Sequence, residues 1–179
     1  MTRRIALLGL SGVGKSTLVR RLGQRLPLLH LQASALIKAE QAHRMQDADS
    51  SEALRTGAVI GNQQLMIAAY MRETAGITPP VVFDGHSIID GRDGLIEIPA
   101  EVFAALNLDA IFYLSARPNV IAERRQADVD RLRPARDAAT LAGHQRIARE
   151  SARAIAAEIG CKFVEISSDG VQTVVDFIG

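Results

Sequence analysis

The sequence predicts a three-layer α/β domain, in which helices flank a five-stranded parallel sheet on both faces. Three observations support this prediction. Short apolar runs, typical of strands buried on both faces, recur along the chain and are separated by helical stretches. Strands that alternate with helices form parallel sheets covered on both faces. Hydrophobic residues make up 47% of the 179 residues, which is enough for a substantial core and excludes a disordered chain.

The first half of the chain is expected to contain two strands and a helix-rich segment. Residues 5–8 are a continuous apolar run, and a helix follows from residue 15 to about residue 26, just before a proline. A second strand is expected at residues 28–31. From residue 34 to about residue 75 the pattern is helical, with a break around residues 57–61.

The second half supplies the other elements of the domain. Gly91 to Gly94 form a tight turn after Asp90, which indicates a hairpin. Gly160 closes a long helix, because glycine readily adopts the left-handed conformation that ends helices. No repeat or linker interrupts the chain, so residues 1–179 are expected to form a single domain. Strands are predicted at residues 81–84, 110–114 and 162–166, the long helix at about 138–159, and a last helix at 171–178.

Charge and composition exclude several classes of protein. The 21 basic and 20 acidic residues leave a net charge of +1, so the chain has no basic surplus for coating nucleic acid. No apolar run is long enough to cross a bilayer, and we expect a cytoplasmic protein, monomeric or a small homo-oligomer, that binds neither nucleic acid nor membrane. Cys161 is the only cysteine, which excludes an intramolecular disulfide and a cysteine-based zinc site.

The strongest chemical signal lies directly after the first predicted strand. Residues 9–17 read GLSGVGKST and match G-x-x-x-x-G-K-[ST], the phosphate-binding loop (P-loop). Glycines let backbone N–H groups point inward at a phosphate, and the following helix adds its positive dipole end. A glycine-rich turn without a ligand is the alternative, but the flanking strand and helix favour a three-layer P-loop NTPase fold. The predicted nucleotide-binding residues are Gly9, Gly12, Val13, Gly14, Lys15, Ser16 and Thr17.

A magnesium site is predicted beside this loop. The Ser16 hydroxyl follows the P-loop lysine, and Mg²⁺ prefers such hard oxygen ligands together with phosphate oxygens. Asp84 closes the strand at residues 81–84, and ligands of α/β sheets bind beyond the carboxyl ends of the strands. We therefore predict Ser16 and Asp84 as metal ligands, although Asp84 could instead simply begin a turn.

Arginine is concentrated in one stretch of the chain. Guanidinium groups bind phosphates bidentately and stay charged, so the stretch is a candidate polyphosphate clamp. Interleaved acidic residues leave a solvated helix face as the alternative. Six of the 18 arginines lie within residues 117–136, namely Arg117, Arg124, Arg125, Arg131, Arg133 and Arg136.

Three parts of the chain together resemble nucleoside monophosphate kinases, and most of all archaeal-type adenylate kinases. These parts are the P-loop, Asp84-Gly85-His86 and residues 114–133. The resemblance implies ATP as phosphoryl donor and a lid at about residues 124–136. It also implies that residues 168–170 correspond to the loop that contacts adenine. Lys15 of the P-loop is expected to reach the β- and γ-phosphates as a catalytic residue. The resemblance adds Arg124, which opens the lid and also contacts the nucleotide, and the pair Arg131 and Arg133 as catalytic residues.

The acceptor side departs from the common adenylate kinases. Their Thr-Gly-Asp-x-x-x-Arg motif corresponds here to residues 33–38, which read ASALIK, and their arginine after the Asp-Gly dipeptide is absent. We place the acceptor-binding segment at about residues 32–75. Each candidate there is also open to the alternative that it is a surface residue of a helix. The predicted acceptor-binding residues are Ser34, Lys38, Arg55, Gln64 and His86, with Gln63 as a further candidate.

These patterns predict a kinase that transfers the γ-phosphoryl group of Mg·ATP to a nucleoside monophosphate. Charge neutralisation and in-line positioning supply most of the catalysis in such a reaction. Two alternatives stay open. One is a kinase for a sugar acid or another alcohol, for which Asp84 or His86 would serve as base. The other is a nucleotide-binding regulatory ATPase.

The lid hypothesis gives a first prediction. Replacing Arg131 and Arg133 with alanine should depress kcat far more than ATP binding, because their contacts belong to the closed, reacting state. Steady-state kinetics with calorimetric ATP titration measures both quantities. If neither kcat nor ATP affinity changes, the arginine cluster is a solvated face.

Overall fold

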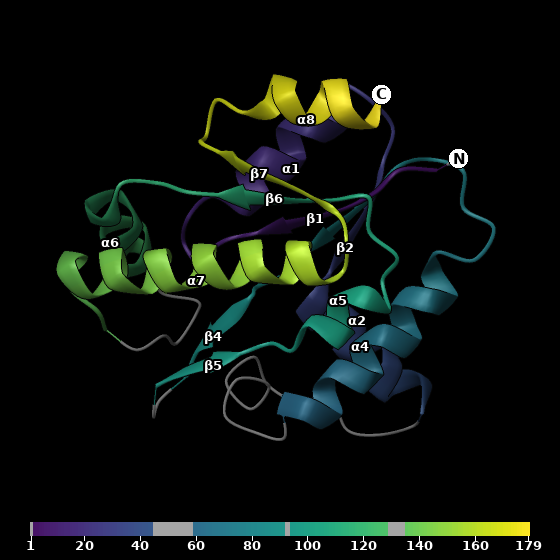
Figure 1. The fold of residues 1–179 in the computed structure, drawn as a ribbon, viewed down its shortest axis with the longest axis horizontal. Helices are drawn as coiled ribbons and strands as arrows, with labels where there is room; N and C mark the ends of the chain where they lie inside the picture. Colours follow the sequence, from purple (N-terminus) through teal and green to yellow (C-terminus); the bar gives the residue numbers. More distant parts are fainter. Residues whose placement is uncertain (1, 45–58, 92–93, 129–134) are drawn as a thin grey trace.

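Five parallel strands form the central sheet of the computed structural model, which describes residues 2–44, 59–91, 94–128 and 135–179 (Figure 1). The sheet confirms the predicted five-stranded parallel architecture. The first strand of the chain lies in the middle of the sheet. The last two strands in sequence lie on one side of it, and the second and third strands lie on the other. Across the sheet, the strands are β2 (Leu29–Gln32), β3 (Val81–Asp84), β1 (Arg4–Leu8), β6 (Ala110–Leu114) and β7 (Lys162–Ile166).

The central strand β1 is apolar because both of its faces are covered. It pairs with β3 through Ile5 opposite Val82, and with β6 through Ile5 opposite Ala110. Residues 5–8 are at most 1% exposed. Strands in this position have no solvent-facing side, which explains why the sequence shows continuous apolar runs instead of alternation.

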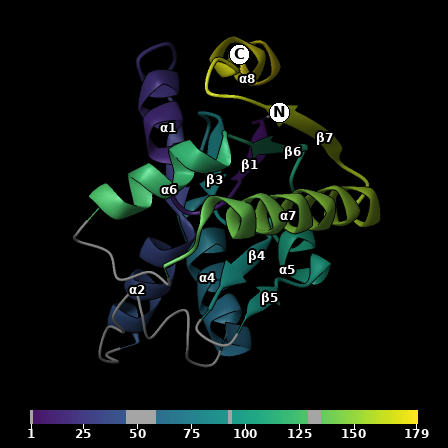
Figure 2. The same cartoon turned by 90° about the vertical axis from the view of Figure 1, so that its left-hand side faces the viewer.

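Helices cover both faces of the sheet. Helix α7 (Ala138–Glu158) packs against β6 and β7 on one face, and α8 (Val171–Ile178) lies on the other face, against α1 (Lys15–Gly23) (Figures 1 and 2). Helices α2 (Ala33–His43) and α4 (Val59–Glu73) pack against each other at one end of the molecule. Within the described residues, no helix has both the length and the apolar character needed to cross a membrane.

Several helices and strands begin or end at residues other than those predicted from the sequence. The first helix ends at Gly23 instead of near residue 26, and residues 24–26 complete a turn in which the Leu26 N–H still reaches the Leu22 carbonyl. The second strand begins one residue later than predicted. Residues 59–61 are helical, so the predicted break does not include them, and residues 57–58 lie outside the described residues. Cys161 lies just before β7 and is half-buried, so it is less enclosed than a core thiol.

A small antiparallel hairpin follows β3, as the Gly91–Gly94 turn predicts. Strands β4 (Ile88–Asp90) and β5 (Leu95–Glu97) pair with Ile89 opposite Ile96, and the Gly91 N–H donates to the Gly94 carbonyl. Figure 1 shows the hairpin below the main sheet, on the same side as α7. Two short helices, α5 (Ala100–Ala104) and α6 (Pro118–Ala127), flank β6 in the sequence. The sequence analysis did not predict α5, which is only five residues long.

A buried carboxylate ties α2 to α4. Glu40 is 4% exposed and accepts hydrogen bonds from Arg72 and from Arg44 Nε, the latter at 2.8 Å. These hydrogen bonds, that of Arg72 first, hold the pKa of Glu40 below its ordinary value of 4.5. The ion pairs therefore stabilise the folded protein wherever the carboxyl is ionised.

This pairing gives a pH-dependent prediction. Glu40→Gln should lower the Tm at pH 7, because it leaves two arginines without their carboxylate. A carboxyl with a lowered folded pKa stabilises above its unfolded pKa, and this contribution disappears as the pH falls through the folded pKa. The difference in Tm from wild type should therefore shrink as the pH is lowered below about 4.5.

Thermal unfolding of Glu150→Gln is the matched control. Glu150 forms an exposed pair with Arg146 one helical turn away, and such surface pairs contribute little. A Glu40→Gln deficit that is equally large at pH 7 and pH 3 would contradict the assignment.

Candidate nucleotide-binding site

A side chain would strain the backbone or clash with a neighbouring strand at two glycines of the loop between β1 and α1. Gly14 has φ 111°, a left-handed conformation that residues with side chains rarely adopt. A Cβ on Gly9 would lie 2.6 Å from the carbonyl oxygen of Leu114 on β6. The loop therefore turns tightly over the carboxyl edge of the sheet before α1 begins.

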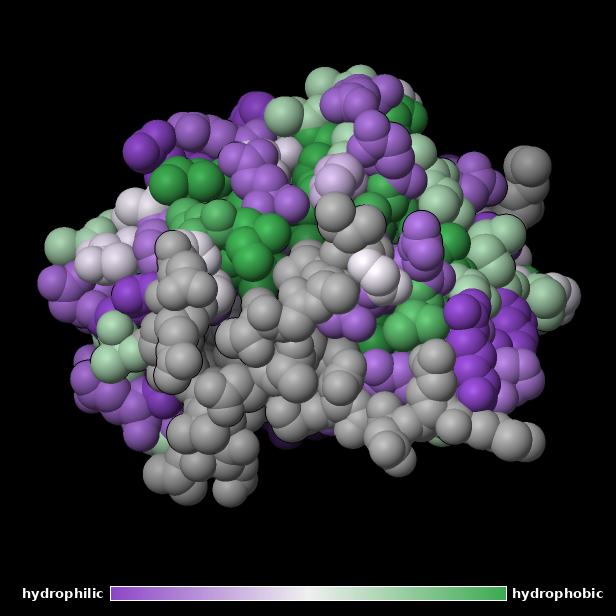
Figure 3. Space-filling model, turned by 90° about the horizontal axis from the view of Figure 1, so that it is seen from below, coloured by the Kyte–Doolittle hydropathy of each residue, from purple (hydrophilic) through white to green (hydrophobic). Residues whose placement is uncertain are grey.

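This loop borders a cavity of about 830 Å³ at the carboxyl ends of β1 and β3. The opposite wall comes from α2, α4, the hairpin and α5, so the cavity joins the P-loop to the segment predicted to bind an acceptor. Figure 3 views the molecule from the side of these elements, and groups of hydrophobic residues lie between hydrophilic ones on that face. Predicted site residues that line the cavity are Gly12, Gly14, Lys15, Ser16, Thr17, Ser34, Lys38, Gln63, Asp84, His86 and Arg124.

Lys15 brings a buried positive charge into this cavity. Its side chain is 8% exposed, and Nζ donates to the Gly9 carbonyl at 3.0 Å. Asp84 Oδ1 lies 3.7 Å from the same ammonium group. A buried charge needs such partners, because removing an ion from water without them costs on the order of several kcal/mol.

Asp84 is 3% exposed at the end of β3 and stays ionised. Burial opposes its ionisation, but the nearby Lys15, His30 and His86 outweigh it, so the pKa of Asp84 lies below its ordinary value. His30 Nε2, on the edge strand β2, is 3.6 Å from Asp84 Oδ2. The site therefore presents a fixed negative charge beside the lysine.

The imidazole ring of His86 contacts the backbone of the loop. Its Nδ1 lies 2.7 Å from the Gly9 carbonyl oxygen, and because a carbonyl only accepts, Nδ1 carries the proton. The Gly9 oxygen thus accepts from both His86 and Lys15. His86, which was predicted to bind the acceptor, lines the cavity and also makes this structural contact with the loop.

Arg124 approaches the P-loop from α6. Its Nη1 donates to the Val13 carbonyl at 2.7 Å, and the same nitrogen would lie 3.0 Å from a Cβ on Gly14. Val13 itself is 2% exposed and faces the core, so only its backbone belongs to the loop surface. The predicted lid therefore begins within a helix, since α6 continues to Ala127.

Other predicted residues fall outside the cavity or outside the described chain. Gln64 is exposed on α4 and does not line the cavity, because the helical step of about 100° from Gln63 turns it away. Arg55, Arg131 and Arg133 lie outside the described residues, and their assignments stay predictions.

An ionic cluster beside the loop was not predicted from the sequence. Asp90, at the end of β4, pairs with Arg125 of α6 at 3.1 Å and with Arg136 at 3.2 Å. Asp90 and Arg125 line the cavity. The arginine stretch pointed to Arg125 and Arg136, but their partner lies 35 and 46 positions earlier, a separation that no local pattern reveals.

Comparison with known proteins identifies the family of the chain. A protein-family model described as "AAA domain" matches residues 8–142. The match includes the P-loop from Gly9 onward and the whole acceptor side of the cavity. The chain therefore belongs to this family of P-loop kinase domains.

Two relatives share the name adenylate kinase. That of Pyrobaculum aerophilum is 26% identical over 154 residues, which cover 86% of this chain and 78% of that protein. That of Pyrococcus abyssi is 29% identical over 157 residues, covering 85% and 79%. The chain is similar to adenylate kinases over most of its length, at modest identity.

Solved structures of other kinases share the fold. A shikimate kinase from Acinetobacter baumannii, in complex with shikimate, has a TM-score of 0.60 at 16% identity and covers 99% of this chain and 93% of its own. A gluconokinase from Sinorhizobium meliloti 1021 has a TM-score of 0.55 at 18% identity, with 97% and 87% covered. At these identities the likeness shows the fold of a P-loop kinase.

The buried lysine supplies the prediction for this site. Lys15→Met keeps the volume of the side chain and removes its charge, and phosphoryl transfer should fall by about a hundredfold or more. ADP formation under saturating ATP measures the loss, and the Tm reports on the fold.

Lys162→Met is the matched control, because Lys162 lies on β7 with its ammonium 5.6 Å from the centre of the Phe177 ring, away from the cavity lining. Near wild-type turnover by Lys15→Met would remove Lys15 from the mechanism.

Proposed function

We propose that this kinase transfers the γ-phosphoryl group of ATP to a nucleoside monophosphate. The observation that carries the proposal is the apolar wall opposite the P-loop. Its members come from β3, α2, α4, the hairpin and α5, so several elements converge on one surface. The apolar wall consists of Ile37, Met66, Phe83, Ile88, Ile89, Ile98, Val102 and Phe103.

A nucleobase fits such a wall better than a polyhydroxylated acceptor does. The flat faces of a base are apolar and its polar atoms lie on its edge, so a few convergent polar groups satisfy it. Each sugar hydroxyl placed against the wall would instead lose its hydrogen bonds to water, at a cost of roughly 1–3 kcal/mol. Ser34, Lys38 and Gln63 border the cavity and supply hydroxyl, ammonium and amide groups for the phosphate and the base edge.

The donor side of the cavity is suited to a polyphosphate. The loop glycines place backbone N–H groups before the N-terminus of α1, and Lys15 lies beside them. We propose that Lys15 exchanges its bond to the Gly9 carbonyl for the β- and γ-phosphates of ATP. Arg124 lies next to Gly14 and is the arginine that we assign to the nucleotide.

The donor atoms beside the loop suit Mg²⁺. Ser16 offers a hydroxyl and Asp84 an ionised carboxylate on the same cavity, and these are the hard oxygens that Mg²⁺ prefers. Among the described residues, no group of three or more His, Cys, Asp or Glu side chains is placed to hold a metal ion by itself. The bound ion would neutralise charge on the phosphates.

The ionised state of the Asp84 carboxylate also favours a phosphate acceptor over an alcohol. An alcohol must lose a proton during transfer and needs a base, whereas a phosphate oxygen is already ionised. The pKa of Asp84 is lowered, chiefly by Lys15 against the effect of burial, which makes this carboxylate a weak base. The name of the two relatives points in the same direction.

An acceptor panel tests the proposal. ADP release should occur with ATP and a nucleoside monophosphate, and should stay at background with ATP alone or with ATP and a sugar acid or shikimate. Phosphorylation of the alcohols but not of the monophosphates would replace the proposal by an alcohol kinase. Acceptor-independent release would indicate an ATPase.

A matched pair of variants examines the apolar wall itself. Val102→Thr places a hydroxyl on the wall at constant shape and should raise the KM for the monophosphate several-fold without changing the KM for ATP. Val174→Thr places the same hydroxyl in α8, where the side chain is buried away from the cavity lining, and should affect only the Tm.

A further inference from the structure

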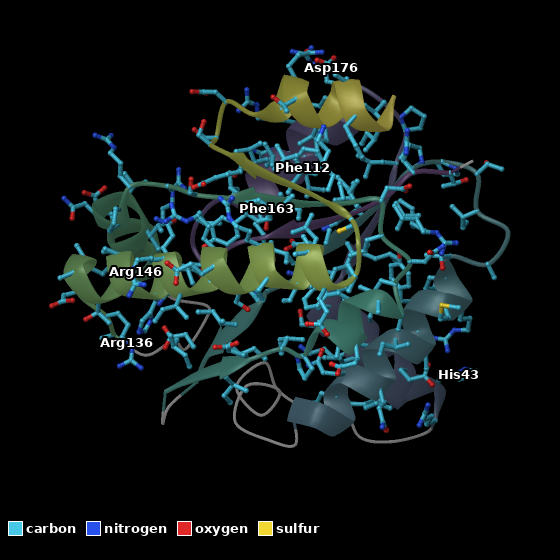
Figure 4. All side chains as sticks on the ribbon, in the orientation of Figure 1. His43, Phe112, Arg136, Arg146, Phe163 and Asp176 are labelled. Atoms are coloured by element: carbon cyan, nitrogen blue, oxygen red, sulfur yellow. The ribbon has the colours of Figure 1, made fainter. Side chains whose placement is uncertain are left out.

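The carboxylate of Asp90 is the centre of a nearly buried ionic cluster. Its side chain is 9% exposed, and three groups from two other segments face it. Arg125 Nη1 lies 3.1 Å from Oδ2, Arg136 Nη2 lies 3.2 Å from Oδ1, and His144 Nδ1 lies 3.6 Å from Oδ2. The cluster joins the β4–β5 hairpin to α6, to His144 in the N-terminal part of α7, and to Arg136 just before α7, which Figure 4 labels.

Arg125 differs from the other two groups because it also reaches the P-loop. Its Nε donates to the Ser11 carbonyl at 2.8 Å while Nη1 binds Asp90, and its side chain is 7% exposed. Arg125 Cγ would lie 3.0 Å from a Cβ on Gly12, so its stem lies directly against the loop. One guanidinium therefore bridges the phosphate-binding loop and the hairpin of the acceptor wall.

We propose that Arg125 is a positioning residue that keeps the P-loop in its phosphate-binding conformation, and that Asp90 fixes Arg125 in place. A P-loop binds anions because its N–H groups point inward, which requires its carbonyls to point away. The hydrogen bond from Arg125 holds the Ser11 carbonyl toward α6, and the ion pair with Asp90 orients the planar guanidinium. Arg125 thus acts on ATP through the backbone of the loop.

The bridge also couples the two substrates. Ile88 and Ile89 of β4 belong to the apolar wall, and Asp90 is the next residue of that strand. An acceptor that packs against the wall would stabilise β4, and with it the bridge to Ser11. Binding of either substrate should then strengthen binding of the other, since such coupling is reciprocal. This second step rests on the proposed function, whereas the positioning role needs only ATP.

The experiment measures ATP affinity calorimetrically, with no acceptor present, for Asp90→Asn and Arg125→Lys. A lysine keeps the charge but cannot reproduce the two-pronged geometry of the guanidinium. Each variant should weaken ATP binding by about tenfold. The double variant should be no weaker than Arg125→Lys, because both changes break the same bridge.

Arg136→Gln is the matched control. Arg136 belongs to the arginine-rich stretch, but in the structure it binds Asp90 and the Gly91 carbonyl and does not line the cavity. Its loss should lower the Tm and leave ATP affinity within about twofold of wild type. If Arg136→Gln weakens ATP binding as much as the other two variants, the cluster only anchors the hairpin, and the proposal is overturned. Unchanged ATP affinity in Asp90→Asn and Arg125→Lys, or losses that multiply in the double variant, overturns it as well.

A neutral double variant covers the case in which a single change leaves an unpaired buried charge and prevents folding. Asp90→Asn with Arg125→Gln removes both charges, which is tolerated far better than the loss of one partner. It should fold and bind ATP about tenfold more weakly, and wild-type affinity would overturn the proposal. Because no acceptor is present, these results do not depend on the acceptor panel, and a failure of either proposal is recognised separately.

Discussion

The buried ammonium group of Lys15 is the charge around which the site is organised. Because Lys15 is nearly inaccessible to water, its charge must be compensated by the protein, and the Gly9 carbonyl and Asp84 provide this compensation. Both partners depend on the sheet. Gly9 directly follows the central strand, and Asp84 ends the neighbouring one, paired in register with Leu7. The parallel order of the strands is therefore what brings a strongly basic and a strongly acidic group to one edge.

The sequence predicted the sheet well because its strands carry a local signal. Strands buried on both faces appear as uninterrupted apolar runs, and all five were found to within one residue at their carboxyl ends. Glycines predicted the hairpin turn and the end of the long helix, because they too are a local signal in the sequence. Helix α5 was missed because five residues are too few to show helical periodicity, and its Val102 and Phe103 are buried through tertiary packing.

The site was predictable to the extent that its chemistry lies within a few consecutive residues. The P-loop is recognisable because it directly follows a strand, and Asp84 because it ends one. The distinction between Gln63, which lines the cavity, and Gln64, which does not, depends on the rotation of α4, and the sequence pattern left both open. The Asp90 cluster is harder still, since it joins three segments that only the tertiary fold brings together.

The two halves of the cavity differ in how well they tolerate substitution of their side chains. On the donor side Lys15, Asp84 and Arg124 are engaged with the loop or with another charge, so a substitution of any of them disturbs its partner. The acceptor wall is built from apolar side chains of separate elements, whose exchange changes shape without leaving a charge unpaired. Kinases of one fold can therefore differ in acceptor, as the names of the similar structures illustrate. The Arg125–Asp90 bridge connects these halves, so changes in the wall can affect the loop through a buried ion pair.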